Sequence, residues 1–497
     1  MEDPILFWNA VALECNRRDH TGVVAARNQR GPTLSSRAMA IVHIAIHDAY
    51  ILARAGLGTP VAANDPYLPA AARPAFSHPG GGGPATSASA VAAAASVTLL
   101  NLYPALSALV DDAFSAFCEM WGADAAGHRF GSAVAQNLLA LRRGDGAEPD
   151  PDFAIADHMD SAAYGRHRED PLNGGQGFLG TRYGFVRPFA ISTFHPLAAH
   201  PNIGTPAYAT HQDEVYRKGA AATSPVVTRT PEETAIGVYW AYDGVKDIGT
   251  PPRLYNQVIR AIAIGKALTT EQYARLFMLV NVTMGDAGIL AWFYKYHYDL
   301  WRPIVGIREY DASMGPAATT GANALDPACD PFWRPLGAPK TNVIDEPVRS
   351  FTPPFPAYPS GHATFGAASL HAARLYLQSI GKATIAADGS DDLGFQLVSD
   401  ELNGKSIDPD DTVRVRHLRS FTGLHEAIFE NAVSRVFLGV HWRFDGTTGT
   451  DAASMLAAGD NIGGVPLGMA IAEDLAGAAN IRPTPASVKP PPLDATP

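Results

Sequence analysis

Three short segments of the sequence carry cationic or nucleophilic side chains in patterns that suit binding of an oxyanion. The first contains Lys295 and Arg302, seven residues apart in a run rich in aromatic residues, just before Pro303. If this run is helical, the two cations stand on nearly one face, about 10 Å apart along the axis, and both side chains can reach one anion. The alternative is a solvated basic stripe, which the aromatic neighbours disfavour.

The second segment reads Pro-Ser-Gly-His and ends at His362, directly before a helical run over residues 363–380. Ser360 therefore stands at a predicted helix start. Unpaired backbone N–H groups, a hydroxyl and the close approach allowed at Gly361 together make an anion cradle, with His362 beside it. The alternative is an ordinary serine N-cap next to an incidental histidine.

The third segment contains Arg435 and His441 at the end of a helix expected from about His425. Residues six apart do not share a face of an ideal helix, so their convergence requires Gly439 to end or bend the helix. Taken as isolated residues, they favour the alternative in which Arg435 is a salt-bridge partner at a helix end and His441 is a buried, hydrogen-bonded histidine.

Together the three segments supply more positive potential than a buried structural site needs, and a bound oxyanion would neutralise it. Phosphate and vanadate fit these residue types equally well. A non-catalytic oxyanion-binding protein is one rival interpretation, but it gives no reason for His362. A zinc site at His43 and His47 is another, which the absence of a glutamate between them and their apolar setting disfavour.

The elements that must position these residues are predicted to be helices. Strand-like alternation is scarce, and Pro- and Gly-rich connectors such as residues 80–83 and 327–359 are predicted to be loops, some of which could roof a pocket. The pattern indicates an all-α architecture of packed bundles. Helical spacing of apolar residues covers 35–52, 88–121, 126–142, 253–266 and 270–301.

Composition excludes several classes of protein. The 497 residues are 46% hydrophobic and 18% charged, which suits a globular chain, and the net charge of -11 argues against nucleic-acid binding. Three separated cysteines imply no disulfide framework. Neither a classical signal peptide nor a run of about 18 uncharged apolar residues is visible, so a soluble protein without a membrane anchor is expected, either secreted or cytoplasmic.

The order Lys-x6-Arg-Pro, Pro-Ser-Gly-His and Ser-Arg-x5-His resembles the pattern shared by vanadium-dependent haloperoxidases and type 2 acid phosphatases. The flanking sequence segments 239–244, 355–359 and 439–445 resemble the chloroperoxidase branch of the haloperoxidases, and the resemblance covers nearly the whole chain. It implies two four-helix bundles packed in one molecule, with long loops. We expect a first half over 1–225, a second half with the vanadate site over 226–482, and a Pro-rich tail over 483–497.

The resemblance also implies a role for each residue of the three segments. His441 would bind the vanadium of vanadate, and no haem is expected. His362 would be the acid-base residue, and Lys295 would polarise peroxide as well as bind the cofactor. The remaining cofactor-binding residues would be Arg302, Ser360, Gly361 and Arg435.

Four further positions follow from the same likeness. Asp243, counted with the catalytic residues, would pair with Arg435 and set its direction, while Asp445 would orient His441. For either carboxylate, the alternative is a helix cap or a surface charge. Trp292 and Phe355 would line the halide pocket, where the apolar Phe355 favours chloride and leaves a bromide preference open.

The implied activity is oxidation of chloride, bromide or iodide by hydrogen peroxide to hypohalous acid, which then halogenates an organic acceptor. Phosphate is expected to compete for the pocket, and nothing indicates an oligomeric state. The alternative is an acid phosphatase in which His441 attacks phosphorus and His362 protonates the leaving group. The core motifs do not separate the two activities; the flanking words favour the haloperoxidase.

Overall fold

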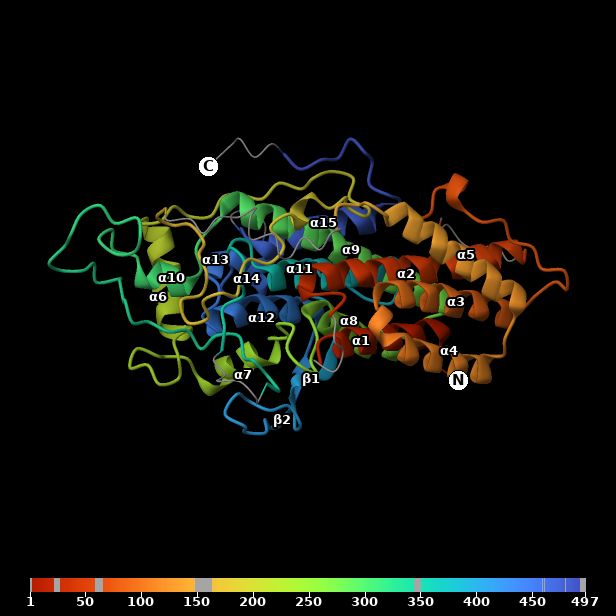
Figure 1. The fold of residues 1–497 in the computed structure, drawn as a ribbon, viewed down its shortest axis with the longest axis horizontal. Helices are drawn as coiled ribbons and strands as arrows, with labels where there is room; N and C mark the ends of the chain where they lie inside the picture. The colour runs from red at the N-terminus through yellow and green to blue at the C-terminus, as the bar shows by residue number, and fades with distance from the viewer. Residues whose placement is uncertain are drawn as a thin grey trace.

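The computed structural model describes residues 2–21, 27–58, 66–147, 163–343, 350–457, 459, 461–478 and 480–491, and these are mostly helical, which confirms the all-α prediction. Figure 1 shows an elongated body of helices with long loops at its ends. The helices are α1 (Pro4–Asp19), α2 (Gly31–Gly56), α3 (Pro84–Leu102), α4 (Ser107–Trp121), α5 (Ala125–Arg142), α6 (Pro206–Lys218), α7 (Pro231–Tyr239), α8 (Pro251–Gly265), α9 (Thr270–Tyr298), α10 (Pro303–Arg308), α11 (Gly361–Ser379), α12 (Leu424–Phe437), α13 (Arg443–Gly446), α14 (Ala452–Leu456) and α15 (Gly464–Gly477).

The first bundle consists of α2, α3, α4 and α5, with α1 alongside. Small residues let α3 and α5 approach closely. A Cβ atom on Gly127 would lie 2.2 Å from the carbonyl oxygen of Thr86, and one on Gly131 would lie 2.0 Å from that of Ala90. Larger side chains at these two glycines would push the helices apart.

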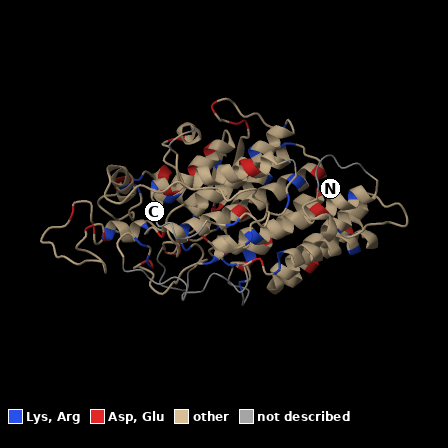
Figure 2. Cartoon of the chain, turned by 90° about the horizontal axis from the view of Figure 1, so that it is seen from above, with Lys and Arg blue, Asp and Glu red and all other residues tan. Residues whose placement is uncertain are grey.

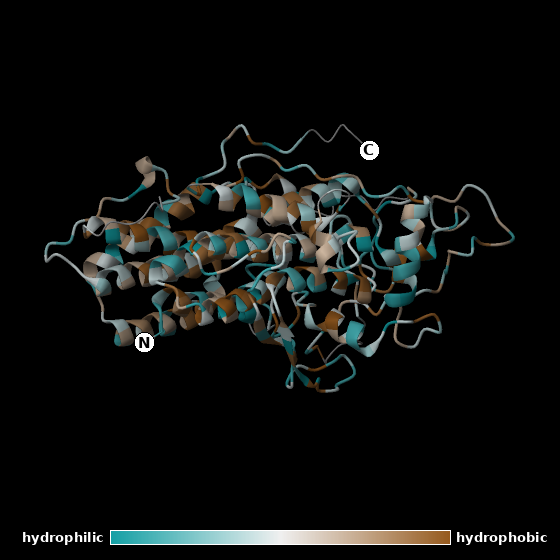
Figure 3. Cartoon of the chain, turned by 180° about the vertical axis from the view of Figure 1, so that it is seen from behind, coloured by the Kyte–Doolittle hydropathy of each residue, from teal (hydrophilic) through white to brown (hydrophobic). Residues whose placement is uncertain are grey.

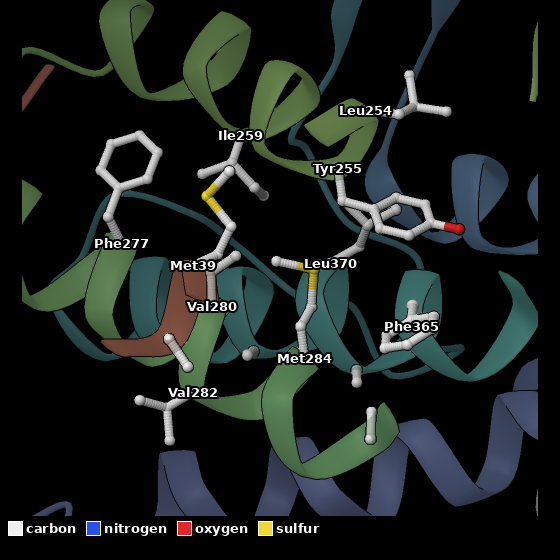
Figure 4. Packing of buried hydrophobic residues seen from close by; sticks show 14 of the residues in the cluster. Met39, Leu254, Tyr255, Ile259, Phe277, Val280, Val282, Met284, Phe365 and Leu370 are labelled. Atoms are coloured by element: carbon white, nitrogen blue, oxygen red, sulfur yellow. The ribbon is translucent and has the colours of Figure 1, made fainter. Parts of the chain in front are cut away.

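The second bundle consists of α9, α11, α12 and α15, with α8 packed on α11. Figure 4 shows its interior, where Phe365 and Leu370 of α11 face Met284 of α9 and Tyr255 of α8. Close approach is again built on glycine, because a Cβ on Gly468 of α15 would lie 2.4 Å from the carbonyl oxygen of Thr364. The first turn of α11 is thereby held tightly.

The two bundles meet along α2 and α9, which pack against each other. A buried polar network crosses the same junction. The side chain of Asn9 in α1 contacts Nε2 of His43 at 2.9 Å and donates to Oδ1 of Asn256 at 3.1 Å, and Asn256 in turn exchanges hydrogen bonds with Asn281 of α9. Each polar group is paired, so the junction is specific as well as apolar.

A two-stranded antiparallel sheet stands outside the bundles, formed by β1 (Phe395–Asn403) and β2 (Arg416–Phe421), with Phe395 paired to Phe421. It anchors the segment that follows α7. The hydroxyl of Ser399 donates to the carbonyl of Tyr239, and Oε1 of Glu401 accepts from the backbone N–H of Tyr242 at 3.0 Å. The hairpin therefore fixes the backbone just before Asp243.

Two predicted helices differ from the structure. The run over 88–121 is two helices, α3 and α4, because Pro104 lacks the N–H that a continuous helix needs. The run over 270–301 ends at Tyr298, since Asp299 adopts a left-handed conformation with φ of 52°. Arg302 consequently precedes α10 and does not share a helix with Lys295, so the helical-spacing argument for these two cations is wrong.

The expectation that no segment is apolar enough to cross a membrane needs correction. Helices α2, α3 and α9 are long and apolar enough, but the relevant windows are 83%, 78% and 100% buried inside the protein. Figure 3 shows hydrophobic residues along the helices of the body. Figure 2 shows Lys and Arg residues and Asp and Glu residues spread along the molecule.

The Pro-rich tail is described as far as residue 491. Beyond α15, Ile481 is buried in the hydrophobic core, Val488 packs against that core, and the N–H of Thr484 donates to the carbonyl of Phe189 at 2.9 Å. The rest of the predicted tail, residues 492–497, lies outside the described residues.

Candidate active site

A cavity of about 510 Å³ opens beside the N-terminus of α11. It draws its lining from both halves of the chain: the segment before α2, the residues after α7, the aromatic end of α9, the loop before α11 and the end of α12. Among the predicted site residues, Asp243, Trp292, Phe355, Gly361, His362, Arg435 and His441 line it. Lys295, Arg302 and Ser360 are fully buried behind this lining.

Lys295 projects from the last turns of α9 into a cluster of carbonyl oxygens. Its Nζ donates to Pro356 at 2.9 Å, Ala357 at 3.3 Å and Pro359 at 2.5 Å. Burial, and next the charge of Arg302, lower the pKa of Lys295 well below its usual value. The three carbonyls act in the opposite sense, because they accept hydrogen bonds from the ammonium and favour the charged form.

Arg302 is held at three of its donor positions. Its Nε donates to the carbonyl of Phe355 at 2.7 Å, and its Nη1 donates to the carbonyl of Val440 at 2.7 Å and lies 2.8 Å from Nε2 of His441. Within the described residues its buried Nη2 has no hydrogen-bond partner. With three of its five N–H donors engaged and both N–H groups of Nη2 unpaired among these residues, this guanidinium is set to bind a further acceptor.

Arg435, in the last turn of α12, forms a two-pronged ion pair with Asp243. Its Nη2 and Nη1 lie 2.8 Å and 3.2 Å from the two carboxylate oxygens. Burial raises the pKa of Asp243, and the charge of Arg435 opposes that rise. The buried Nε of Arg435 has no partner among the described residues, so this cation too keeps one donor for a ligand.

His441 follows the bend required at Gly439, which has φ of +72° just beyond the end of α12. Nδ1 of the ring lies 2.8 Å from Oδ2 of Asp445, and the same oxygen accepts from the backbone N–H of Trp442 at 2.9 Å. Burial raises the pKa of Asp445 to about 8 and lowers that of His441.

Because Oδ2 of Asp445 already accepts from the backbone N–H of Trp442, it faces Nδ1 of His441 as an acceptor, which places the ring proton of His441 on Nδ1. Nε2 of His441 then carries a lone pair, which is consistent with its 2.8 Å contact to a nitrogen of Arg302.

Ser360 and Gly361 form the start of α11, as predicted. The backbone N–H of Ser360 donates to the carbonyl of Asp445 at 2.7 Å, and its hydroxyl caps the helix by accepting from Ala363 at 3.4 Å. A Cβ on Gly361 would lie 3.2 Å from the ring of Trp292. Glycine thus lets the helix N-terminus sit against the indole at the cavity wall.

His362 is 7% exposed and lies one residue into α11. Its Nε2 lies 2.6 Å from the carbonyl oxygen of Ala241. A carbonyl only accepts, so Nε2 carries the proton and Nδ1 carries the lone pair. Burial, and next the charge of Arg435, lower the pKa of His362 well below its usual value, so the ring is neutral and able to take up a proton.

Trp292 and Phe355 are in contact, with ring centroids 4.8 Å apart. The face of Phe355 lies 4.9 Å from Nζ of Lys295 and 4.8 Å from Cζ of Arg302. The ring of Phe355 therefore contacts two buried cations and also lines the cavity. Such contacts stabilise desolvated cations by about 2 kcal/mol or more.

These contacts fit a tetrahedral oxyanion. Lys295, Arg302 and Arg435 bring three positive charges, and among the described carboxylates only Asp243 forms an ion pair with one of them, Arg435. Unpaired donors on Arg302 and Arg435 are costly when buried, and an anion would satisfy both. By contrast, no group of three or more His, Cys, Asp or Glu side chains able to hold a metal ion directly occurs in the described part of the chain.

Several cavity residues were missed by reasoning from the sequence. His20, Arg27 and Arg30 belong to the segment between α1 and α2, more than 200 residues from the three motifs, and no spacing links them to the site. Pro353 and Pro354 lie in the Pro-rich connector predicted to be a loop, so composition indicated their place in a loop and not their contact with the cavity.

Comparison with known proteins gives matches over both halves. The family model "VCPO second helical-bundle domain" matches residues 275–461, and "Vanadium chloroperoxidase N-terminal domain" matches residues 2–153. The chain is also 34% identical to the vanadium chloroperoxidase of Curvularia inaequalis, in an alignment that covers 99% of this chain and 92% of that protein.

Solved structures share the fold. A bacterial vanadium-dependent iodoperoxidase superposes with a TM-score of 0.62 at 18% identity, covering 95% of this chain and 94% of that one. A bacterial vanadium-dependent chloroperoxidase in its holo form gives a TM-score of 0.58 at 15% identity, covering 93% and 95%.

Proposed function

The chain belongs to the vanadium chloroperoxidase family of vanadium-dependent haloperoxidases, and from that premise we propose that it binds vanadate in the cradle around His441 and uses hydrogen peroxide to oxidise halide ions to hypohalous acid. One observation carries the proposal: Nη2 of Arg302 and Nε of Arg435 are buried donors without a hydrogen-bond partner among the described residues, and they belong to the same site as His441, whose Nε2 carries a lone pair.

We assign the residues of the cradle as follows. Arg302 and Arg435 would hold the oxygens of vanadate, together with Lys295, Ser360 and the N–H of Gly361, and His441 would bind the metal through Nε2. When bound, vanadate supplies a Lewis-acidic centre that activates peroxide toward attack by halide. Every other contribution comes from groups of the chain that are fixed before the reaction.

His362 is assigned as the acid-base residue. Its Nδ1 is left free to accept a proton because Nε2 is committed to the carbonyl of Ala241. At neutral pH the ring is neutral, and this form can receive the proton released when peroxide binds. The same ring can later return the proton to the oxygen that leaves as hypohalous acid. Asp243 keeps Arg435 directed at the cradle, and Asp445 keeps the lone pair of His441 directed there.

The halide would enter past Trp292 and Phe355, which make an apolar wall. An apolar wall holds the halide poorly hydrated and so more reactive. We propose chloride as a substrate, with bromide and iodide oxidised more easily. The similar proteins include an iodoperoxidase and chloroperoxidases, so the rates with chloride, bromide and iodide are to be compared.

One experiment tests the activity. The phosphate-free protein is assayed for peroxide-dependent bromination of an organic acceptor with and without added orthovanadate. Activity that appears only with vanadate and is inhibited by phosphate is expected. Hydrolysis of a phosphate ester at a rate unaffected by peroxide, without any bromination, would instead support the acid phosphatase alternative.

A further inference from the structure

The cavity is much larger than a halide and extends past the cradle to the segment between α1 and α2. At about 510 Å³ it falls in the size range of pockets that enclose an organic molecule. His20 lines it next to the backbone that carries Asp243: a Cβ on Gly244 would lie 3.6 Å from Cδ2 of His20 and 3.9 Å from Nε2. The wall is thus continuous from Arg435 through Asp243 to His20.

His20 presents an unpaired acceptor there. The ring is 2% exposed, and its Nδ1 lies 3.0 Å from the carbonyl oxygen of Asn16, so Nδ1 carries the proton. Nε2 then carries the lone pair, and within the described residues it has no partner. Burial lowers the pKa of His20, which keeps the ring neutral. A buried acceptor without a donor is costly, and a ligand O–H or N–H would remove that cost.

Positive charge lies at the same end of the cavity. Arg27 is exposed, Arg30 is half-buried, and both line the cavity. The charge of Arg27 contributes to lowering the pKa of His20. The lining of the cavity also includes apolar residues, among them Phe351, Pro353 and Pro354. An acceptor, two cations and flat apolar surfaces together fit one chemical class: an aromatic ring with a hydroxyl and an acidic substituent.

We propose that this end of the cavity binds the organic acceptor of the reaction, an aromatic hydroxy acid whose O–H donates to Nε2 of His20 and whose acid group pairs with Arg27 and Arg30. This inference rests on the proposed haloperoxidase function. Halogen transfer then occurs on a bound ring: a carbon–halogen bond forms as the O–halogen bond of hypohalous acid breaks, and the ring proton combines with the released hydroxide as water. The ring carbon is oxidised and the halogen reduced.

Binding is measured first, without peroxide or halide, so that it is independent of turnover. The vanadate-saturated full chain is titrated calorimetrically with 4-hydroxybenzoate, with 4-hydroxybenzamide, which lacks the acid group, and with 4-methoxybenzoate, which lacks the O–H. Arg27→Gln, and the double variant with Arg30→Gln, should weaken binding of the two acids about fivefold to tenfold and leave the amide unchanged. His20→Phe should weaken the two hydroxyl-bearing probes by a similar factor and spare 4-methoxybenzoate.

Arg143→Gln is the matched control, because Arg143 is an exposed arginine that lines a different cavity. Arg27 is exposed as well, so its variants remain informative if His20→Phe does not fold. Probe affinities that are the same in wild type, Arg27→Gln and the double variant would overturn the proposal, as would an equal loss in Arg143→Gln. Loss of acid binding on saturation with vanadate would also overturn it, because the acid would then occupy the cradle.

Turnover provides a second, independent readout. Brominating an equimolar mixture of 4-hydroxybenzoate and 4-hydroxybenzamide should favour the acid in wild type and lose that preference in the Arg27 variants, with total peroxide consumption unchanged. Hypohalous acid reacting free in solution would give the same product ratio with every variant, which would contradict the proposal. If no bromination occurs, the proposed function fails, while the binding results still decide the acceptor site.

Discussion

Nδ1 of His441 lies 2.8 Å from Oδ2 of Asp445, and Nε2 of the same ring lies 2.8 Å from Nη1 of Arg302. The carboxylate fixes which ring nitrogen carries the proton, and the arginine lies at the nitrogen left for a ligand. Asp445 and Arg302 therefore fix the tautomer and the orientation of the His441 ring before any cofactor binds.

His441→Ala is expected to abolish tight vanadate binding, and Asp445→Asn to weaken it about tenfold to a hundredfold, because an amide holds the ring without the negative charge. The measurement is equilibrium dialysis against orthovanadate, with thermal unfolding as the folding control. Vanadate affinity equal to wild type in His441→Ala would remove His441 from the role of metal ligand.

His362→Ala should retain most vanadate affinity and lose turnover by about 10² to 10⁴, since acid-base catalysis typically contributes that factor. The ring contacts the carbonyl of Ala241 and no other cradle residue through its nitrogens, so its loss leaves the oxyanion contacts in place. Steady-state bromination at saturating vanadate is the test. A kcat like that of wild type would assign proton transfer to another group.

Phe355→His should lower chloride oxidation more than bromide oxidation. The substitution replaces a ring that covers Lys295 and Arg302 by one that can itself become positively charged and hydrogen-bond in the cavity. Because chloride is harder to oxidise than bromide, the rate of chloride oxidation should fall more than the rate of bromide oxidation. The ratio of the two kcat/KM values, at one pH and at saturating vanadate, is compared with wild type; an equal or larger chloride-to-bromide ratio would exclude the role of Phe355 in halide choice.

His43 should make the protein sensitive to mild acid. Burial lowers its pKa to about 4, with Nδ1 at the carbonyl of Met39 and Nε2 at the amide of Asn9, whereas in the unfolded chain the pKa returns to about 6.5. Between these values the unfolded state binds more protons at this site. Stability is therefore full above about pH 6.5 and falls by at most about 1.4 kcal/mol per pH unit as the pH drops toward 4.

His43→Gln should remove this part of the acid sensitivity while lowering stability at neutral pH. Urea unfolding of both proteins at pH 7 and pH 5 gives the comparison, in which all other titrating groups cancel. Identical pH dependence in the two proteins would contradict the assignment. Zinc should not stabilise the wild type, and a zinc-dependent rise in its unfolding midpoint would support the rival zinc site at His43 and His47.

The sequence predicted the helices, and the three segments whose residues meet at the cavity, from local signals, and it failed where tertiary contacts decide. Ser360 at a helix start and the bend at Gly439 follow from capping and from backbone freedom, both of which are local. The meeting of Lys295 with Arg302 was expected for a wrong reason: they converge through the loop before α11, which supplies carbonyls to both. No periodicity could place His20 beside Gly244, because that contact joins α1 to the turn before α8.

The loop over residues 353–359 contacts the buried cations with its backbone and lines the cavity with its side chains. Its carbonyl oxygens at Phe355, Pro356, Ala357 and Pro359 hold Lys295 and Arg302, while Pro353, Pro354 and the ring of Phe355 form part of the cavity lining. A substitution in this loop that alters which molecules the cavity admits is therefore also expected to move Lys295 and Arg302. Substitutions in this loop that broaden the range of acceptors should therefore weaken vanadate retention, whereas substitutions at Arg27, which is exposed and far from the loop in the sequence, should leave vanadate retention unchanged.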